Sequence, residues 1–287
     1  MRPNIGQLGF TLVEMVVTMV ISVIVVGFVA VFISGPVAGF TDQARRAGLS
    51  DAADGALNRL VRDVRRALPN SIRITNAGGV QALELMSSVD GARYRRSPPG
   101  ASQQILDFAV ADDAFNTIGS FTQISKPFTS NSHYLVIYNV GVTGADAYAL
   151  TDVITPAGTQ ISIADDVPAG EDRVTLTPGF RFAYESPRQR LFLVDTPVTY
   201  LCDTATATLR RYVNYPIAVS QADRDTAGEL LAAGAGTTLL ADQITSCGFD
   251  YTPGTAERAA LVTISLGVGA QGENVALLRQ VHVDNAP

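Results

Sequence analysis

The feature that most constrains this sequence is a predominantly apolar run from Phe10 to Ile33 that contains one charged side chain, Glu14. As a helix, these 24 residues would be about 36 Å long, enough to cross the roughly 30 Å hydrocarbon core of a bilayer. A carboxylate inside such a span is costly unless it pairs with a cation or faces a protein interior. The run therefore predicts a membrane-spanning helix in which Glu14 needs a partner.

One interpretation of this run is a secretory signal core or a simple anchor, with Glu14 tolerated near the interface. A secretory signal has a shorter apolar region and a clearer basic head, whereas residues 1–9 carry Arg2 as their one charged side chain. Residues 9–14, GFTLVE, instead resemble the class III signal of type IV pilins and type II secretion pseudopilins. The resemblance implies that a prepilin peptidase cleaves after Gly9, that Phe10 becomes a methylated N-terminus, and that Glu14 is functional.

The chemistry of these three positions can be argued separately. Gly9 has no side chain, so its backbone can extend into a protease cleft at the membrane surface. Cleavage leaves a charged amine on Phe10. In a filament of packed N-terminal helices, a neighbour's amine is the nearest cation for Glu14. The carboxylate would then set the register of assembly.

Length and charge limit the possibilities for the rest of the chain. The 287 residues can hold one domain of about 200 residues plus an anchor, or two small domains. The net charge of -6 argues against general nucleic-acid binding, which depends on a basic footprint. Charge alone leaves the topology ambiguous, because Arg2 precedes the span and Arg45 and Arg46 follow it.

The cleavage signal implies a topology, since prepilin peptidases act on the cytoplasmic side. We therefore expect a single-pass inner-membrane protein whose remaining residues are periplasmic. In that oxidising compartment, Cys202 and Cys247 are expected to form a disulfide, the alternative being two unrelated buried thiols.

The helix is predicted to continue to Leu68, with a bend where Ser34-Gly35-Pro36 weakens its hydrogen bonding. Apolar residues then recur in steps of four and three, which predicts one buried stripe: Leu49, Ala53, Leu57, Leu60, Val64 and Leu68. The charged residues of this segment are expected to lie largely on the other faces of the helix: Asp51, Asp54, Arg59, Arg62, Asp63 and Arg66. Pro69-Asn70 ends the helix. The sequence thus divides into a leader (1–9), a membrane-spanning half-helix (10–33), an amphipathic half-helix (34–68) and a β-rich head domain (69–287).

Short β-type runs come next, separated by Gly, Pro, Asn and Asp clusters. The candidate strands are 71–75, 82–86, 133–140, 160–163, 173–177, 198–202, 209–212, 249–251, 261–266 and 275–283. The clearest hairpin pairs 180–184 with 190–194, and 227–241 looks helical at its ends. We predict an α+β fold in which the long N-terminal helix packs on a mostly antiparallel sheet.

The head offers few residues for chemistry. Residues 91–104, with Arg93, Arg95 and Arg96, are predicted to be an exposed loop, the alternative being a site for an acidic partner or DNA. The pairs at 112–113 and 165–166 are Asp-Asp, but neither has the oxygen spacing of a known calcium loop. His133 and His282 lie in β-type runs and are expected to pack there. No phosphate loop, metal-type His/Cys cluster or nucleophile elbow occurs, so we predict neither an enzyme nor a cofactor.

Three further segments, 60–73, 193–202 and 280–287, are similar to minor pilins of the mannose-sensitive haemagglutinin (MSHA) type IV pilus. This implies a low-abundance subunit that helps initiate or cap a pilus and supports surface attachment. Its partners would be major and minor pilins and the inner-membrane assembly machinery. The alternatives are a large J-type pseudopilin of type II secretion, or a membrane-tethered adhesin or DNA-uptake receptor.

Overall fold

The structure is a computed structural model, and it describes residues 9–97, 105–166, 170–254 and 258–283. The chain divides into two compact units, Met1–Leu49 and Ser50–Pro287. Helix α1, Leu12–Arg65, begins in the first unit and ends in the second. The leader residues 1–8 lie outside the described residues.

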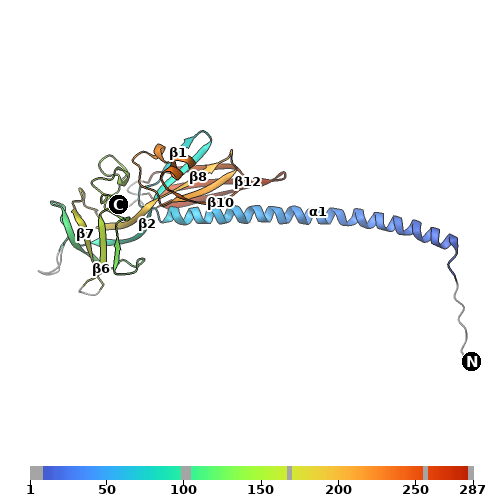
Figure 1. Cartoon of the computed structure of the whole chain (residues 1–287), viewed down its shortest axis with the longest axis horizontal. Helices are drawn as coiled ribbons and strands as arrows, with labels where there is room; N and C mark the ends of the chain where they lie inside the picture. The colour runs from blue at the N-terminus through green and yellow to red at the C-terminus, as the bar shows by residue number, and fades with distance from the viewer. Residues whose placement is uncertain (1–8, 98–104, 167–169, 255–257, 284–287) are drawn as a thin grey trace, which may run out of the picture. The chain divides into compact units, whose positions relative to one another are not determined.

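Antiparallel strands dominate the second unit (Figure 1). They are β1 (Arg73–Ala77), β2 (Val80–Tyr94), β3 (Asp112–Ile118), β4 (Phe128–Ser130), β5 (Tyr134–Val136), β6 (Gln160–Asp165), β7 (Asp172–Phe180), β8 (Arg190–Asp203), β9 (Thr208–Val213), β10 (Gly236–Ala241), β11 (Ile244–Thr252), β12 (Ala260–Ala270) and β13 (Glu273–Val283). The short helices are η1 (Ala147–Ala149), η2 (Gln221–Asp223) and α2 (Ala227–Ala232). A long N-terminal helix followed by antiparallel sheets confirms the predicted α+β fold.

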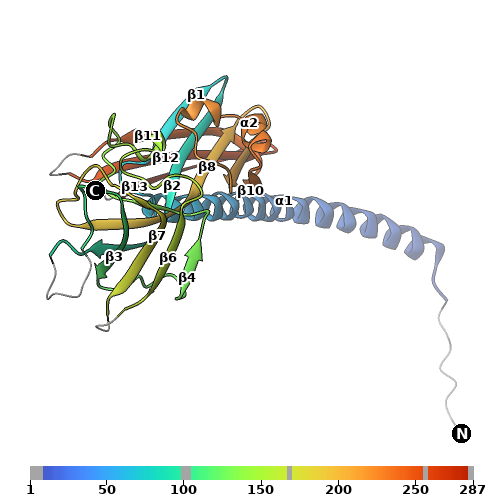
Figure 2. The same cartoon turned by 60° about the vertical axis from the view of Figure 1, so that its left-hand side comes forward.

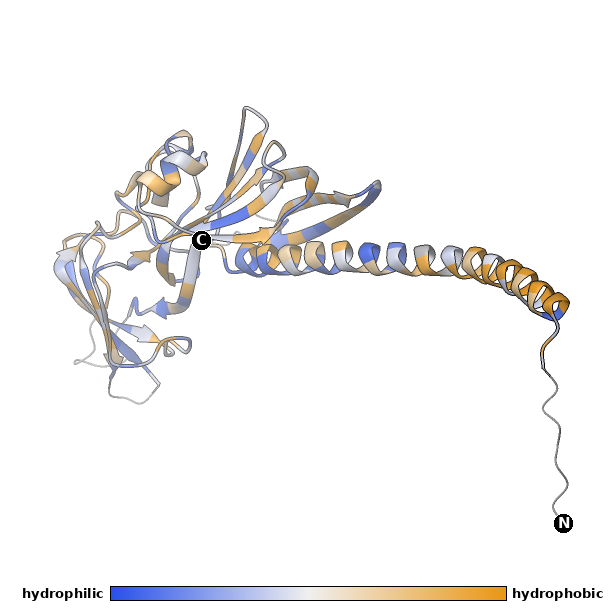
Figure 3. Cartoon of the chain, turned by 45° about the vertical axis from the view of Figure 1, so that its right-hand side comes forward, coloured by the Kyte–Doolittle hydropathy of each residue, from blue (hydrophilic) through white to orange (hydrophobic). Residues whose placement is uncertain are grey.

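In the first unit, α1 is predominantly apolar over its N-terminal turns, as the orange colouring in Figure 3 shows, and Glu14 is the charged residue of its first turn. Hydroxyl groups in this part bond back to the helix: Thr18 donates to the carbonyl of Glu14 at 2.9 Å, and Ser22 to that of Thr18 at 2.7 Å. Such bonds satisfy these two hydroxyl groups in an apolar environment. The helix runs through Gly35 and Pro36 as one element, so the proline does not interrupt it.

In the second unit, α1 buries the predicted stripe. Leu57, Leu60 and Val64 are fully buried, which confirms the prediction from their spacing. Both sheets reach the helix, because Tyr200 of β8 bonds Asp63 at 2.8 Å and Arg279 of β13 pairs with Asp54 at 2.7 Å. The stripe exists because sheet faces cover this side of the helix.

Two sheets make up the second unit. The larger has the order β10-β9-β8-β2-β3-β7-β6-β4, with β1 beside β2 and β5 beside β8, and the smaller has the order β11-β12-β13. β2 pairs with β8 from Val80 to Arg93, and the register shifts at Ser88. Figures 1 and 2 both show β6 and β7 on one side, with β1, β8, β10 and β12 on the other. The long strands β2 and β8 thus belong to both halves of the larger sheet.

Several local predictions were wrong. The hairpin of 180–184 with 190–194 does not form, since β7 ends at Phe180 and β8 pairs with β2, β5 and β9. Residues 227–241 begin as α2 but end as strand β10, paired with β9. Strands β3 and β4 were not predicted. The hairpin, β3 and β4 concern strands with distant partners in the sequence, whereas β10 pairs with β9, the strand before it.

Candidate assembly site at the start of the helix

The Gly9-Phe10 junction lies before the helix. Gly9 and Phe10 are exposed, Phe10 to 80%, and α1 begins at Leu12. Thr11 caps the helix: its hydroxyl accepts the N–H of Glu14 at 3.3 Å, and its carbonyl accepts that of Met15 at 3.1 Å. The junction predicted for cleavage is therefore accessible, non-helical backbone.

Glu14 occupies the first turn of α1, where an acidic side chain interacts favourably with the helix dipole. The capping bond uses its backbone N–H, so its carboxylate is not needed for the cap. Within the part of the chain that the structure describes, no side chain pairs with this carboxylate. A cation for Glu14 in a membrane would have to come from residues not described or from another molecule.

The helix behind Glu14 matches a bilayer in length. An 18-residue window of α1 has a mean hydropathy of 3.0 and is not buried. Residues 12–33 rise about 33 Å at 1.5 Å per residue, close to a hydrocarbon core of roughly 30 Å. By length and composition, α1 can cross a membrane.

The predicted disulfide joins the two sheets. Cys202 of β8 is bonded to Cys247 of β11, with their Cα atoms 6.5 Å apart. The residues are 45 apart in the sequence. The pairing expected from the periplasmic topology is thus present, and the alternative of two separate thiols is wrong.

The arginine-rich segment 91–104 is only partly a loop, which corrects its prediction. Residues 91–94 complete strand β2, and residues 98–104 lie outside the described residues. Arg95 is buried and pairs with Glu171, whereas Arg96 is exposed and pairs with Glu185 at 2.7 Å. Arg93 remains exposed with no carboxylate partner in the described chain.

Three of the four paired aspartates at 112–113 and 165–166 take part in internal bonds. Asp112 accepts the backbone N–H groups of Asp107 and Ala114, at 2.8 and 3.1 Å. Asp165 pairs with Lys126 at 2.5 Å, and Asp166 accepts the amide of Asn116 at 2.7 Å. Asp165 and Asp172 together raise the pKa of Lys126. No group of three metal-ligating side chains occurs among the described residues.

The two histidines do not pack as predicted. His133 precedes strand β5 and is half-buried, with Ser130 2.7 Å from its Nδ1 and the ring of Phe128 5.3 Å away. His282 lies within β13, but its side chain is exposed.

Sequence reasoning missed a buried charge at the end of α1. Asp63, expected largely on another face, is buried and accepts hydrogen bonds from Tyr200 at 2.8 Å and Arg211 at 2.7 Å. Burial and the neighbouring Asp63 carboxylate raise the pKa of Tyr200. The only sequence signal was that Asp63 follows Leu60 by three residues, which places it beside the buried stripe.

A second buried charge is Glu84 of β2, which is 0% exposed. Arg73 donates to it at 2.5 Å and Tyr215 at 3.1 Å. Burial raises the pKa of Glu84, and Arg73 opposes that shift. Arg73 also lies 3.5 Å from the ring centre of Tyr148. These contacts join β1, β2, the short helix η1 and the loop that holds Tyr215.

Comparison with protein families finds one match at the start of the chain. Residues 5–30 match the prokaryotic N-terminal methylation motif. Comparisons with curated proteins and with solved structures found no match. The matched residues include the accessible Gly9-Phe10 junction, the capped first turn and Glu14, and the layout of apolar helix followed by antiparallel sheets is that of a type IV pilin. The motif is a prepilin signal, which implies processing by a prepilin peptidase, and it supports placing this chain among the type IV pilins and pseudopilins.

Proposed function

We propose that the protein is a minor pilin that initiates or caps a type IV pilus of the MSHA type, similar to the minor pilin MshO, and supports surface attachment. The observation that carries the proposal is an exposed apolar helix with a single carboxylate in its capped first turn. The similarity of segments 60–73, 193–202 and 280–287 to MSHA minor pilins supports the choice of pilus. The role is structural, with no cofactor.

Processing at Gly9-Phe10 prepares the subunit for assembly. The peptidase cuts exposed, non-helical backbone, and the new amine on Phe10 lies four residues from Glu14. Where apolar helices of several subunits pack together, an amine of one subunit can pair with Glu14 of the next. An unpaired carboxylate in the membrane is costly, so this pairing selects one register.

The size of the second unit suits a tip or priming position. Its residues, Ser50–Pro287, need not repeat along a shaft. We place the protein in the inner membrane as a single-pass subunit with a periplasmic head before assembly, and at the pilus tip afterwards. Its partners are the prepilin peptidase, other pilins and the inner-membrane assembly machinery.

The first test is the mass of the mature protein. Protein purified from membranes of cells with an active prepilin peptidase should lack residues 1–9 and carry one methyl group on Phe10. An intact mass that still includes Met1 would contradict the processing step.

The second test is Glu14→Ala, which leaves the capping bond in place because that bond uses the backbone. An acid at the centre of a span costs about 2.5 to 3.5 kcal/mol, and less near the interface, so insertion and cleavage should be unchanged or improved. Recovery with partner pilins and pilus number should fall, and Glu14→Asp should be intermediate.

Ser22→Ala is the matched control, since it removes another polar group from the same span. It should leave piliation unchanged. Normal piliation and partner recovery with Glu14→Ala would refute the register role. Recovery of type II secretion pseudopilins in place of pilins would identify a J-type pseudopilin instead.

A further inference from the structure

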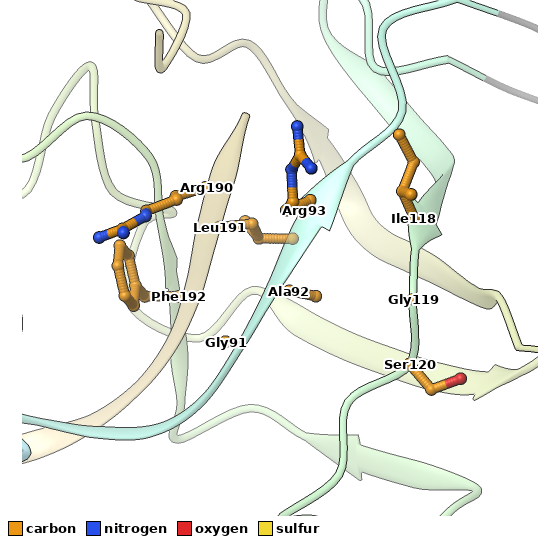
Figure 4. Close-up of a pocket in the computed structure, with 9 residues that line it drawn as sticks. All are labelled: Gly91, Ala92, Arg93, Ile118, Gly119, Ser120, Arg190, Leu191 and Phe192. Carbon is orange, nitrogen blue, oxygen red and sulfur yellow. The ribbon is translucent and has the colours of Figure 1, made fainter. Parts of the chain in front are cut away.

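A groove follows the edge of β2 in the second unit. It consists of two hollows of about 380 and 600 Å³ that share Gly91 and Phe192. Figure 4 shows the smaller hollow, with Gly91 and Arg93 on β2 between Phe192 on one side and Ile118 to Ser120 on the other. The larger one continues toward Arg65 and Arg66 at the end of α1.

The groove exists because β2 has no strand beside part of one edge. β8 pairs with β2 up to Arg93, but on the other edge β1 pairs only with 80–84 and β3 only with 93–94. The chain around Ala67 covers residues 87–88. On the edge away from β8, residues 89–92 therefore have no neighbouring strand, over about 13 Å at 3.3 Å per residue.

The floor of the groove is already formed. Gly91 has no side chain, and the ring of Phe192 lies 3.5 Å from where a Cβ would stand. The buried carboxylate of Asp90 accepts the N–H of Gly91 at 2.8 Å and that of Gln123 at 2.6 Å. Val89 and Ala92 add apolar surface. A ligand therefore meets a floor that combines polar and apolar surface and whose carboxylate is already bonded.

The rim carries arginines that lack carboxylate partners. Arg65, Arg66 and Arg93 line the groove, and the described residues provide no ion pair for any of them. Some arginines elsewhere in the second unit do pair, as Arg95 does with Glu171 and Arg211 with Asp63, whereas others, such as Arg173, are exposed without a carboxylate partner among the described residues. The helix dipole stabilises the charge of Arg65, because this residue lies in the last turn of α1. Arg93 lies on a strand, so no helix dipole stabilises its charge. In a chain with 27 acidic and 21 basic residues, three arginines without acidic partners around one groove indicate an acidic ligand.

We propose that this groove binds an extended acidic segment of a partner protein. Arginine forms bidentate bonds with carboxylates, and an extended segment presents alternate side chains to the rim and the floor. Its acidic residues would bind the arginines while its apolar residues would contact Phe192 and Val89. Nucleic acid fits less well, because backbone binding needs a broad basic footprint. The inference concerns residues of β2, β8 and the end of α1, and it does not depend on the proposed pilus role.

The test is fluorescence anisotropy with the full chain in detergent micelles and its disulfide intact. The probe is a labelled ten-residue peptide that alternates glutamate and valine, and the comparison peptide has glutamine in place of glutamate. The double variant Arg66→Gln/Arg93→Gln should weaken binding of the glutamate peptide at least fivefold. Arg173→Gln removes one exposed charge outside the groove and should change it less than twofold.

A second variant, Gly91→Leu, places a side chain in the hollow without removing a charge, and it should weaken binding of the glutamate peptide by a similar factor. Circular dichroism confirms that each variant is folded. Equal binding of the glutamate and glutamine peptides would overturn the proposal. So would an equal loss with Arg173→Gln, or tighter binding of a ten-nucleotide oligothymidylate than of the glutamate peptide.

Discussion

Replacing Cys202 and Cys247 together with alanine would remove the covalent bond between β8 and β11. The bond closes a loop of 45 residues, and the chain-entropy relation gives about 4 kcal/mol of stabilisation at 25 °C for a loop of that length. Cys202 is fully buried, but the loss of its sulfur atom adds only a small cavity, and Cys247 is half-buried. We expect the free energy of unfolding to fall by about 3 to 4 kcal/mol.

The loss of stability should be greatest in the smaller sheet, β11 to β13. Besides the disulfide, β11 is bonded to β2 by the N–H of Phe249, which donates to Gln81 at 2.8 Å. β13 is bonded to α1 by Arg279 and Asp54, an ion pair that is well exposed and hence weak. Without the disulfide, β11 to β13 should open more readily than β6 and β7, which lie in the larger sheet.

Urea unfolding in detergent micelles measures the total effect. The chain has nine tyrosines and no tryptophan, so tyrosine fluorescence and circular dichroism are the suitable signals. Hydrogen exchange then locates the effect by comparing peptides from β11 to β13 with peptides from β6 and β7. A loss below about 1 kcal/mol, or equal acceleration of exchange in both groups, would refute the reasoning.

Three further substitutions test the interior of the second unit. Leu60→Ala removes a fully buried side chain and should cost about 2 to 5 kcal/mol in urea unfolding. Asp63→Ala leaves Arg211 without its carboxylate and should cost less than the roughly 3 to 5 kcal/mol of a fully buried pair, because this pair is partly exposed. Burial raises the pKa of Glu84 above its ordinary 4.5, so the native state binds this proton more tightly than the unfolded state. The resulting stability is present below pH 4.5 and is lost as pH rises through the raised pKa. Glu84→Gln should therefore reduce the decline in stability above that pH.

Arg62→Ala is the control for the two helix substitutions, because Arg62 is exposed on the same part of α1. It should change the free energy of unfolding by less than about 0.5 kcal/mol. A Leu60→Ala variant as stable as this control would show that the stripe is not packed. An unchanged pH profile for Glu84→Gln would show that the proton of Glu84 is not linked to folding.

Local patterns in the sequence predicted the helix well. The spacing of Leu57, Leu60 and Val64 is a property of the helix itself, so it could be recognised without knowing what covers it. Strand partners could not be predicted in this way. The hairpin of 180–184 with 190–194 was wrong because β8 pairs with β2, about a hundred residues away in the sequence, and only tertiary packing selects such a partner.

The candidate sites show the same difference between local and distant residues. Residues 9–14 form a continuous motif, so Gly9, Phe10 and Glu14 could be selected from the sequence. Asp63 bonds Tyr200 across 137 residues, and the Tyr215–Glu84 bond spans 131. No pattern in the sequence relates such residues. The groove beside Gly91 likewise follows from where β1 and β3 stop along β2, which only the structure shows.

The buried stripe on α1 also decides where the chain could be shortened to give a soluble fragment. The second unit begins at Ser50, and Leu57, Leu60 and Val64 are fully buried within it. A fragment that starts at Pro69 would lack these side chains and would leave Tyr200 and Arg211 without Asp63. We expect it to aggregate through the uncovered sheet faces. A fragment that starts at Ser50 retains the helix turns on which the sheets are built, so it is the one to crystallise.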